Sequence, residues 1–204
     1  RGKPPRATIV TEPDAPKPPD PNRPKGPDED LYDYASLLYE RKEYALALDS
    51  FGQYLQRYPA GRHVPMCLFR IGESYVNQNQ AGDAEKYFLE VVNRYPSSEG
   101  APSAAYRLGA IRFNERKFDE SAKYFAFSES KSSFPQIKLA AGYNKSRAYQ
   151  MLGDRKKMMT ALREVAAVKK DNPYLESALL SLATALLSED KKKESLTMFL
   201  DLIE

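Results

Sequence analysis

The sequence predicts an all-α protein, a right-handed α-solenoid of about five helix-turn-helix hairpins preceded by an extended proline-rich tail. Three observations predict this fold: an internal repeat, helical spacing of apolar residues inside each repeat, and a change of composition after residue 30. The repeat appears as two ladders of mostly large apolar residues, in which every step is 37 residues. The ladders are Phe51, Phe88, Phe125, Leu162 and Phe199, and Tyr32, Phe69, Tyr106, Tyr143 and Leu180. Such a period is typical of stacked helical repeats.

Within each repeat, apolar residues recur every three or four positions, which predicts two amphipathic helices. In the second repeat this spacing runs through Leu68, Ile71 and Tyr75 and resumes at Ala84 and Phe88. A turn-like segment separates the two runs, so each repeat reads as a helix, a tight turn and a second helix. The predicted units are about 31–65, 66–102, 103–139, 140–174 and 175–204.

Proline marks where the second helices end, because it cannot extend a helix and biases the preceding residue away from helical angles. Tyr-Pro pairs at 58–59 and 95–96 end the second helices of the first two units. In the third and fourth units the corresponding prolines, Pro135 and Pro173, lie two and three residues later than the period requires. We therefore expect slightly longer second helices and shorter connectors in these two units.

The first thirty residues form the predicted tail, since they hold nine of the fifteen prolines. Ile9 and Val10 are their only large aliphatic residues, too few to offset the entropy of ordering the segment. We expect an extended linker between the repeats and an upstream domain or lipid anchor. Alternatively, the segment 7–10 docks on a partner or folds back onto the groove of its own chain.

Composition argues against several functions. The net charge of +3 is too small and too scattered to indicate nucleic-acid binding, and no apolar stretch is long enough to cross a membrane. Cys67 and His63 are the only cysteine and histidine, so we expect no disulfide, metal site, cofactor or catalytic triad. Cys67 is interpreted as a small buried hydrophobe and His63 as a surface-loop residue. We predict that the chain is not an enzyme.

These motifs resemble a known family. Residues 68–75, Leu-Phe-Arg-Ile-Gly-Glu-Ser-Tyr, followed by Ala84 and Phe88, are similar to the tetratricopeptide repeat (TPR) pattern. The resemblance extends over residues 31–204 and implies a solenoid that holds other proteins. The fourth unit departs from the pattern, because Met158 stands where a small residue is usual and Lys145 where leucine is usual.

The 37-residue step is longer than the usual ~34 for this family. Together with the connector 94–101, it is similar to bacterial envelope repeats such as the outer-membrane assembly lipoprotein BamD and the Tol-Pal accessory protein. This resemblance implies a non-catalytic scaffold of a cell-envelope complex, in the bacterial periplasm or on the periplasmic face of a membrane. Two alternatives stay open: a cytosolic adaptor, and the TPR portion of a larger protein whose activity lies elsewhere.

In the TPR family, the first helix of each hairpin lines a concave groove. The resemblance therefore implies that partner proteins or peptide segments, or the chain's own residues 1–30, bind there. Aromatic rings would supply apolar area, asparagine amides would pair with a peptide backbone, and arginines would take carboxylates. The predicted groove residues are Tyr32, Phe69, Arg70, Asn77, Tyr106, Arg107, Asn114, Tyr143 and Arg147. The alternative is that the aromatic residues pack between adjacent first helices.

Two further expectations concern the groove and the end of the solenoid. Aromatic residues occupy the position where a lysine would grip a chaperone C-terminus in this family, so we do not expect that ligand. The last unit ends at residues 202–204 without a polar capping helix, which solenoids normally need. We expect that the native protein continues or that another chain covers this end.

Overall fold

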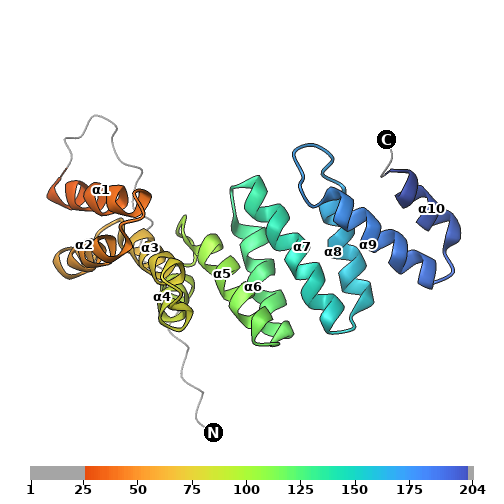
Figure 1. Cartoon of the computed structure of the whole chain (residues 1–204), viewed down its shortest axis with the longest axis horizontal. Helices are drawn as coiled ribbons and strands as arrows, with labels where there is room; N and C mark the ends of the chain where they lie inside the picture. The colour runs from red at the N-terminus through yellow and green to blue at the C-terminus, as the bar shows by residue number, and fades with distance from the viewer. Residues whose placement is uncertain (1–25, 202–204) are drawn as a thin grey trace, which may run out of the picture.

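The computed structural model describes residues 26–201, except the side chain of Ala81. Over this range the chain forms ten α-helices and no strand, arranged as five hairpins that follow one another along the long axis (Figure 1). The helices are α1 (Pro27–Glu40), α2 (Tyr44–Arg57), α3 (Val64–Asn77), α4 (Ala81–Arg94), α5 (Ala101–Asn114), α6 (Phe118–Lys131), α7 (Pro135–Met151), α8 (Arg155–Ala166), α9 (Leu175–Ser188) and α10 (Lys192–Leu200). The predicted fold class is confirmed for these residues. The predictions for residues 1–25 and 202–204 lie outside the described range.

The turns inside the hairpins share one geometry. Each has three residues, and its middle residue is left-handed, with φ between 58° and 74°. These residues recur every 37 positions and are Lys42, Asn79, Arg116, Gly153 and Asp190. The next amide donates to the carbonyl five residues earlier, as from Lys117 to Arg112 at 2.9 Å, which satisfies an otherwise free carbonyl at the helix end.

Inside the hairpins, residues of the phenylalanine ladder pack against a ladder of small residues on the first helices, which includes Gly72 and Gly109. A Cβ atom on Gly72 would lie 2.5 Å from the Phe88 ring, and one on Gly109 would lie 2.8 Å from the Phe125 ring. Where the helices cross, the Ser121 hydroxyl donates to the Gly109 carbonyl at 2.8 Å. The absent side chains let the two helices approach until the phenylalanine ring is buried.

Successive hairpins stack so that each second helix packs on the first helix of its own hairpin and on that of the next one. First helices also contact one another from α1 through α3 and α5 to α7. The first helices therefore form an inner layer and the second helices an outer layer. We call the solvent-facing side of the inner layer, turned away from the second helices, the inner face.

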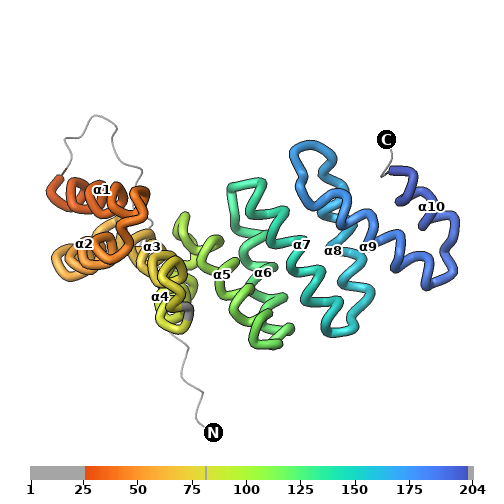
Figure 2. The backbone as a smooth tube through the Cα atoms, in the orientation of Figure 1, coloured from red at the N-terminus to blue at the C-terminus, as the bar shows by residue number. Residues whose placement is uncertain are grey.

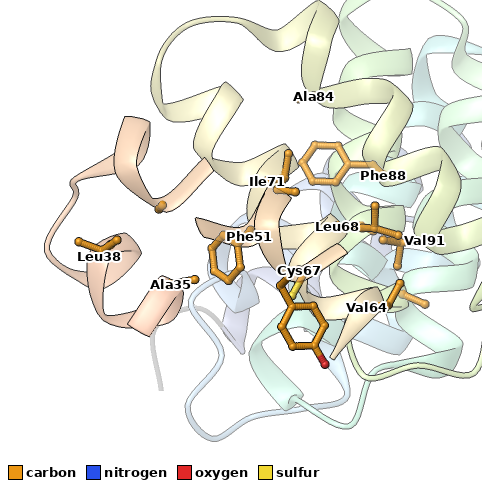
Figure 3. Packing of buried hydrophobic residues seen from close by; sticks show 14 of the residues in the cluster. Ala35, Leu38, Phe51, Val64, Cys67, Leu68, Ile71, Ala84, Phe88 and Val91 are labelled. Atoms are coloured by element: carbon orange, nitrogen blue, oxygen red, sulfur yellow. The ribbon is translucent and has the colours of Figure 1, made fainter. Parts of the chain in front are cut away.

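The apolar core is divided into two clusters. One extends from α1 to α5, with Phe51 near Ala35 and Cys67 in Figure 3, and the other joins α7, α8 and α9. Between them Lys145 is nearly buried and pairs with Glu129 of α6 and with Glu164 of α8, the latter at 3.2 Å. Burial alone would lower the pKa of Lys145, but the two carboxylates outweigh it and raise the pKa. Lys145, which departs from the repeat pattern, thus forms polar contacts that connect α7 to α6 and α8.

The expectation of longer second helices in the third and fourth units is wrong. It is the first helix α7 that is longer, because it begins at Pro135, ahead of the unit start expected at 140. Helix α8 is shorter and ends at Ala166, followed by a long loop that is visible in Figure 2. The Asn172 amide in this loop donates to the carbonyls of Val165 and Val168 at 2.8 Å each. These bonds hold the loop against the end of α8, which stops well before Pro173.

Candidate partner-binding face

The predicted aromatic residues pack within the solenoid. All four rings are half-buried, and in the first three units each contacts the phenylalanine of its own second helix. The ring centroids are 6.3 Å apart for Tyr32 and Phe51, 5.9 Å for Phe69 and Phe88, and 5.5 Å for Tyr106 and Phe125. Tyr143 instead stacks on Tyr174, at 5.0 Å. In the first three units these rings thus pack across their own hairpin, and a role in partner binding stays a prediction.

His63 is not simply a surface residue, which corrects the expectation from the sequence. Its ring stacks on Tyr32 with centroids 3.9 Å apart, and its Nε2 accepts a hydrogen bond from Nε of Arg62 at 2.9 Å. Burial and the charge of Arg62 lower the pKa of His63. The imidazole thus packs at the junction between the first and second hairpins. Cys67 is fully buried, as expected.

The arginine ladder connects neighbouring first helices. Arg70 on α3 lies over the ring of Tyr39 on α1, with its guanidinium carbon 4.4 Å from the ring centroid. One period later, Arg107 on α5 makes two hydrogen bonds of 2.6 Å to the Glu73 carboxylate on α3. Burial alone would lower the pKa of Arg107, but Glu73 outweighs it and raises the pKa. Both arginines are therefore committed to contacts inside the molecule.

Sequence reasoning missed two members of this set. Asn144 stands one period after Arg107, and its Nδ2 atom donates to the Tyr106 hydroxyl at 3.1 Å. It is the third residue in the ladder that reaches back to the preceding first helix. Glu73 lies three residues after Arg70, on the same helical face, and could have been identified from that spacing.

The other predicted polar residues remain exposed but are not arranged alike. The Asn77 amide donates to the Glu73 carbonyl of its own helix at 2.8 Å. Arg147 lies over the Phe113 ring at 5.0 Å and donates to Asn144 Oδ1 at 3.2 Å. Asn114 is also exposed. A role of these residues in partner binding stays a prediction.

An open groove of about 570 Å³ lies between the end of the α7–α8 hairpin and α9. Its lining includes Met158 at the position where earlier units have a small residue, and Leu180, whose side chain is 52 % exposed. In earlier units the position of Leu180 holds aromatic rings that pack inward. The full lining is Gln150, Gly153, Arg155, Met158, Leu180, Ser181, Thr184, Ala185 and Ser188.

The chemistry of this groove is mainly apolar. The hydroxyls of Ser181, Thr184 and Ser188 all donate to carbonyls of their own helix, at 2.7 to 2.8 Å. Thr184 and Ser188 nevertheless remain exposed. Arg155 lies at one edge, where it donates to the Ala185 carbonyl and to the Ser188 hydroxyl, and its Nε lies 3.1 Å from the Glu189 carboxylate. The groove therefore suits an apolar side chain, with a charged contact beside it.

Within 26–201 no group of three or more histidine, cysteine or acidic side chains is arranged to hold a metal ion. No helix in the same range combines the length and apolar character that crossing a membrane requires.

Comparison with known proteins gives one family match. Residues 31–60 and 66–98 match the model of the tetratricopeptide repeat, so the match covers the first two hairpins. TPR domains are generally non-catalytic scaffolds that bind other proteins. No curated protein matches the chain significantly.

The solenoid is similar to several solved structures. MamA from Desulfovibrio magneticus RS-1, from residue 41 to its end, is 16% identical, with 86% of this chain and 93% of that chain covered and a TM-score of 0.63. A putative kinesin light chain from Podosopora anserina with TPR-like repeats is 14% identical, with 85% and 92% covered and a TM-score of 0.58. Apo RapI is 13% identical, with 86% and 52% covered and a TM-score of 0.64. At these identities the similarity shows the fold. The first two hairpins thus match the tetratricopeptide repeat model, and residues 26–201 have the fold of a TPR solenoid.

Proposed function

We propose that this chain is a non-catalytic scaffold that holds a segment of a partner protein in the open groove between the α7–α8 hairpin and α9, which we call the α7–α9 groove. The observation that carries the proposal is the difference between units. In the first three units the aromatic and arginine ladders are engaged in contacts within the molecule, whereas the groove beside Leu180 is open.

The lining indicates which segment would fit. Leu180 and Met158 offer an apolar floor, and the amide of Gln150 can pair with a peptide backbone. Arg155 would meet a carboxylate of the partner by exchanging its contact with Glu189. We therefore propose a peptide segment with a large apolar side chain next to an acidic residue. Arg147, which is exposed on α7, would extend the charged contact along the inner face.

The experiment that tests this proposal uses two matched threonines. Thr184 lines the groove, whereas Thr160 lies exposed on α8 in the outer layer; in each, the hydroxyl donates to a carbonyl of its own helix. Photo-crosslinking from a probe amino acid at Thr184 in the native host, followed by mass spectrometry, should identify a partner. Thr184→Arg should then abolish binding of that purified partner, while Thr160→Arg should retain it. Equal binding by both variants would exclude the groove.

We also propose that the scaffold works in a bacterial cell envelope, in the periplasm or on the periplasmic face of a membrane. The proposal rests on the resemblance of the 94–101 connector to envelope repeats and on the proline-rich linker composition of residues 1–30. Fractionation of host cells that express the whole gene product tests it. Recovery in the periplasm, or in the membrane fraction with a lipid label, supports the proposal. Recovery in the cytosol favours the cytosolic adaptor instead.

A further inference from the structure

The first hairpin, α1 and α2, forms one end of the solenoid (Figure 1) and exposes three large apolar side chains. Tyr34 and Leu37 of α1 are 55% and 43% exposed, and Leu46 of α2 is 55% exposed. The terminal repeat of a solenoid normally turns a polar face to water. We call the surface made by Tyr34, Leu37 and Leu46, together with Asp30 and Asp33 of α1, the front face.

The front face takes the positions that later hairpins turn toward the preceding hairpin. Two periods after Asp33, Arg107 pairs with Glu73 on the preceding first helix. One period after Tyr34 stands Ile71, which is buried in the core cluster that includes residues of the first hairpin. With no hairpin before α1 in the described range, the front face is open to water.

Leu46 departs from the repeat. In the later units its position holds exposed charged residues, which are Asp83, Glu120, Lys157 and Glu194. In the third hairpin Glu120 pairs with Arg112, which also pairs with Glu85 of the preceding second helix. The position therefore lies on the side of the preceding hairpin, and only the first unit places an apolar residue there. The end of the repeat array alone does not explain this leucine.

The first hairpin is acidic, whereas the segment before it is basic. Residues 27–57 hold seven acidic and three basic side chains, a net charge of −4. Asp30 and Asp33 bring part of this negative charge to the front face. Residues 1–25 hold six basic and three acidic side chains, a net charge of +3. The segment and the hairpin therefore attract each other, while the front faces of two copies would repel.

The segment before α1 also contains one short apolar stretch, Ile9 and Val10, which are its only large aliphatic residues. Its first six residues hold three bases and no acid, so positive charge comes shortly before apolar side chains. The front face has the matching order along α1, because Asp30 lies one turn before Tyr34 and two turns before Leu37.

The segment is long enough to reach the front face. Sixteen residues, 11–26, connect it to the start of α1 at Pro27, and in the polyproline conformation they would span up to about 50 Å. Helix α1, at about 1.5 Å per residue, is only about 21 Å long. A short flexible tether sets an effective concentration in the millimolar range, so a contact that is weak between separate molecules is made within one chain.

We propose that residues 6–10 of this chain, which lie outside the described range, dock on the front face alongside α1. Arg6 meets the two front-face carboxylates, and Ile9 and Val10 lie on its apolar part, so the chain covers its own exposed end. This contact lies on the first hairpin, away from the α7–α9 groove, so either site can exist without the other (Figure 1).

Disulfide trapping in the full chain tests the proposal without altering any residue of the contact. Thr11→Cys places a thiol directly after the docked residues, and Arg41→Cys places one a turn beyond Leu37 on the same side of α1. Gln56→Cys is the matched control, because Gln56 is exposed near the end of α2, which lies beside the start of α1 where the tether is attached. Cys67 does not compete, because it is fully buried and burial raises its pKa to about 12.

We expect the cystine between positions 11 and 41 to form at least about tenfold faster than the one between positions 11 and 56, as measured by non-reducing electrophoresis. Ile9→Asp should abolish this difference, whereas Ala15→Asp, which adds the same charge outside the docked residues, should retain it. On the front face, Leu46→Glu should abolish the difference, and Leu187→Glu, at a position 52% exposed in α9, should retain it. Circular dichroism checks that all variants fold.

Three results would overturn the proposal. The first is an equal rate of cystine formation at positions 41 and 56, since the tether alone would then set both rates. The second is a difference that survives Ile9→Asp or Leu46→Glu, because the apolar contact would then not hold the segment. The third is cystine formation mainly between two chains, since the segment would then dock on another copy.

Discussion

The Gly72→Ala variant should have a clearly lower free energy of unfolding than a variant with the same substitution at an uncrowded helical glycine. The added methyl carbon would lie 2.5 Å from one carbon of the Phe88 ring and 2.9 Å from two others. The ring would have to withdraw by about 0.9 Å to reach ordinary contact, from a site that is fully buried. Overpacking of this kind costs about 1–3 kcal/mol, while the better helix propensity of alanine returns about 1 kcal/mol.

Gly52→Ala isolates the steric cost. Gly52 also lies in the middle of a helix, α2, but no atom lies within 4 Å of its Cβ position. This variant should gain about 1 kcal/mol from propensity alone. The difference in unfolding free energy between the two variants is then the overpacking term, about 1–3 kcal/mol. Urea denaturation followed by far-ultraviolet circular dichroism measures it.

Gly72 and Phe88 should also be energetically coupled, because they are in direct contact. Phe88→Leu should cost less in the Gly72→Ala background than in the unmodified chain, because the smaller side chain makes room for the methyl group. If Gly72→Ala and Gly52→Ala are equally stabilising, the Phe88 ring is free to move. The close approach of the two helices would then not depend on the missing side chain, and the explanation given for the small-residue ladder would be refuted.

Three further changes test the polar contacts. Arg107→Ala should lower the free energy of unfolding by about 1–2 kcal/mol in urea denaturation, less than for a fully buried pair because the Arg107 side chain is 41% exposed. Adding Glu73→Gln to the Arg107→Ala variant should recover part of this loss. No recovery would contradict the pairing of the two residues. Lys145→Met should destabilise the chain by about 1–3 kcal/mol, whereas Lys145→Met with Glu129→Gln should be close to neutral, and equal losses would argue against a coupled network. Because burial lowers the pKa of His63, the unfolded state takes up the proton more readily, so the free energy of unfolding should fall as pH drops below the ordinary value of 6.5. His63→Phe should remove this part of the pH dependence, and an unchanged slope between about pH 7.5 and about pH 5.5 would contradict the assignment.

Much of the fold could be predicted because the repeat encodes it directly. The 37-residue ladder through Phe51 places one large apolar residue in every hairpin, and the first four hairpins bury it. The hairpin turns carry a weaker signal, since only Gly153 among the five left-handed residues is glycine. Helix ends near Pro135 were misplaced because proline fits the first turn of a helix as well as the end of the preceding one.

The candidate site was less predictable than the fold. The sequence indicates that Arg70 and Arg107 share a helical face, but not what each guanidinium touches. Their partners Tyr39 and Glu73 lie 31 and 34 residues earlier, on the preceding first helix, so they are found only once the stacking is known. The open groove depends on what Leu180 and Met158 leave unfilled, and no spacing rule gives a volume.

The constant length of the hairpin turns has a consequence for engineering this chain. Each turn spans three residues in all five hairpins, whereas the connectors between hairpins vary, from 132–134 to 167–174. One residue added to a turn would rotate the following helix by about 100° and carry its phenylalanine away from the core. A residue added to a connector need only lengthen an exposed loop. Labels, tags and cleavage sites therefore belong in the loop 167–174, where the chain already accommodates extra length.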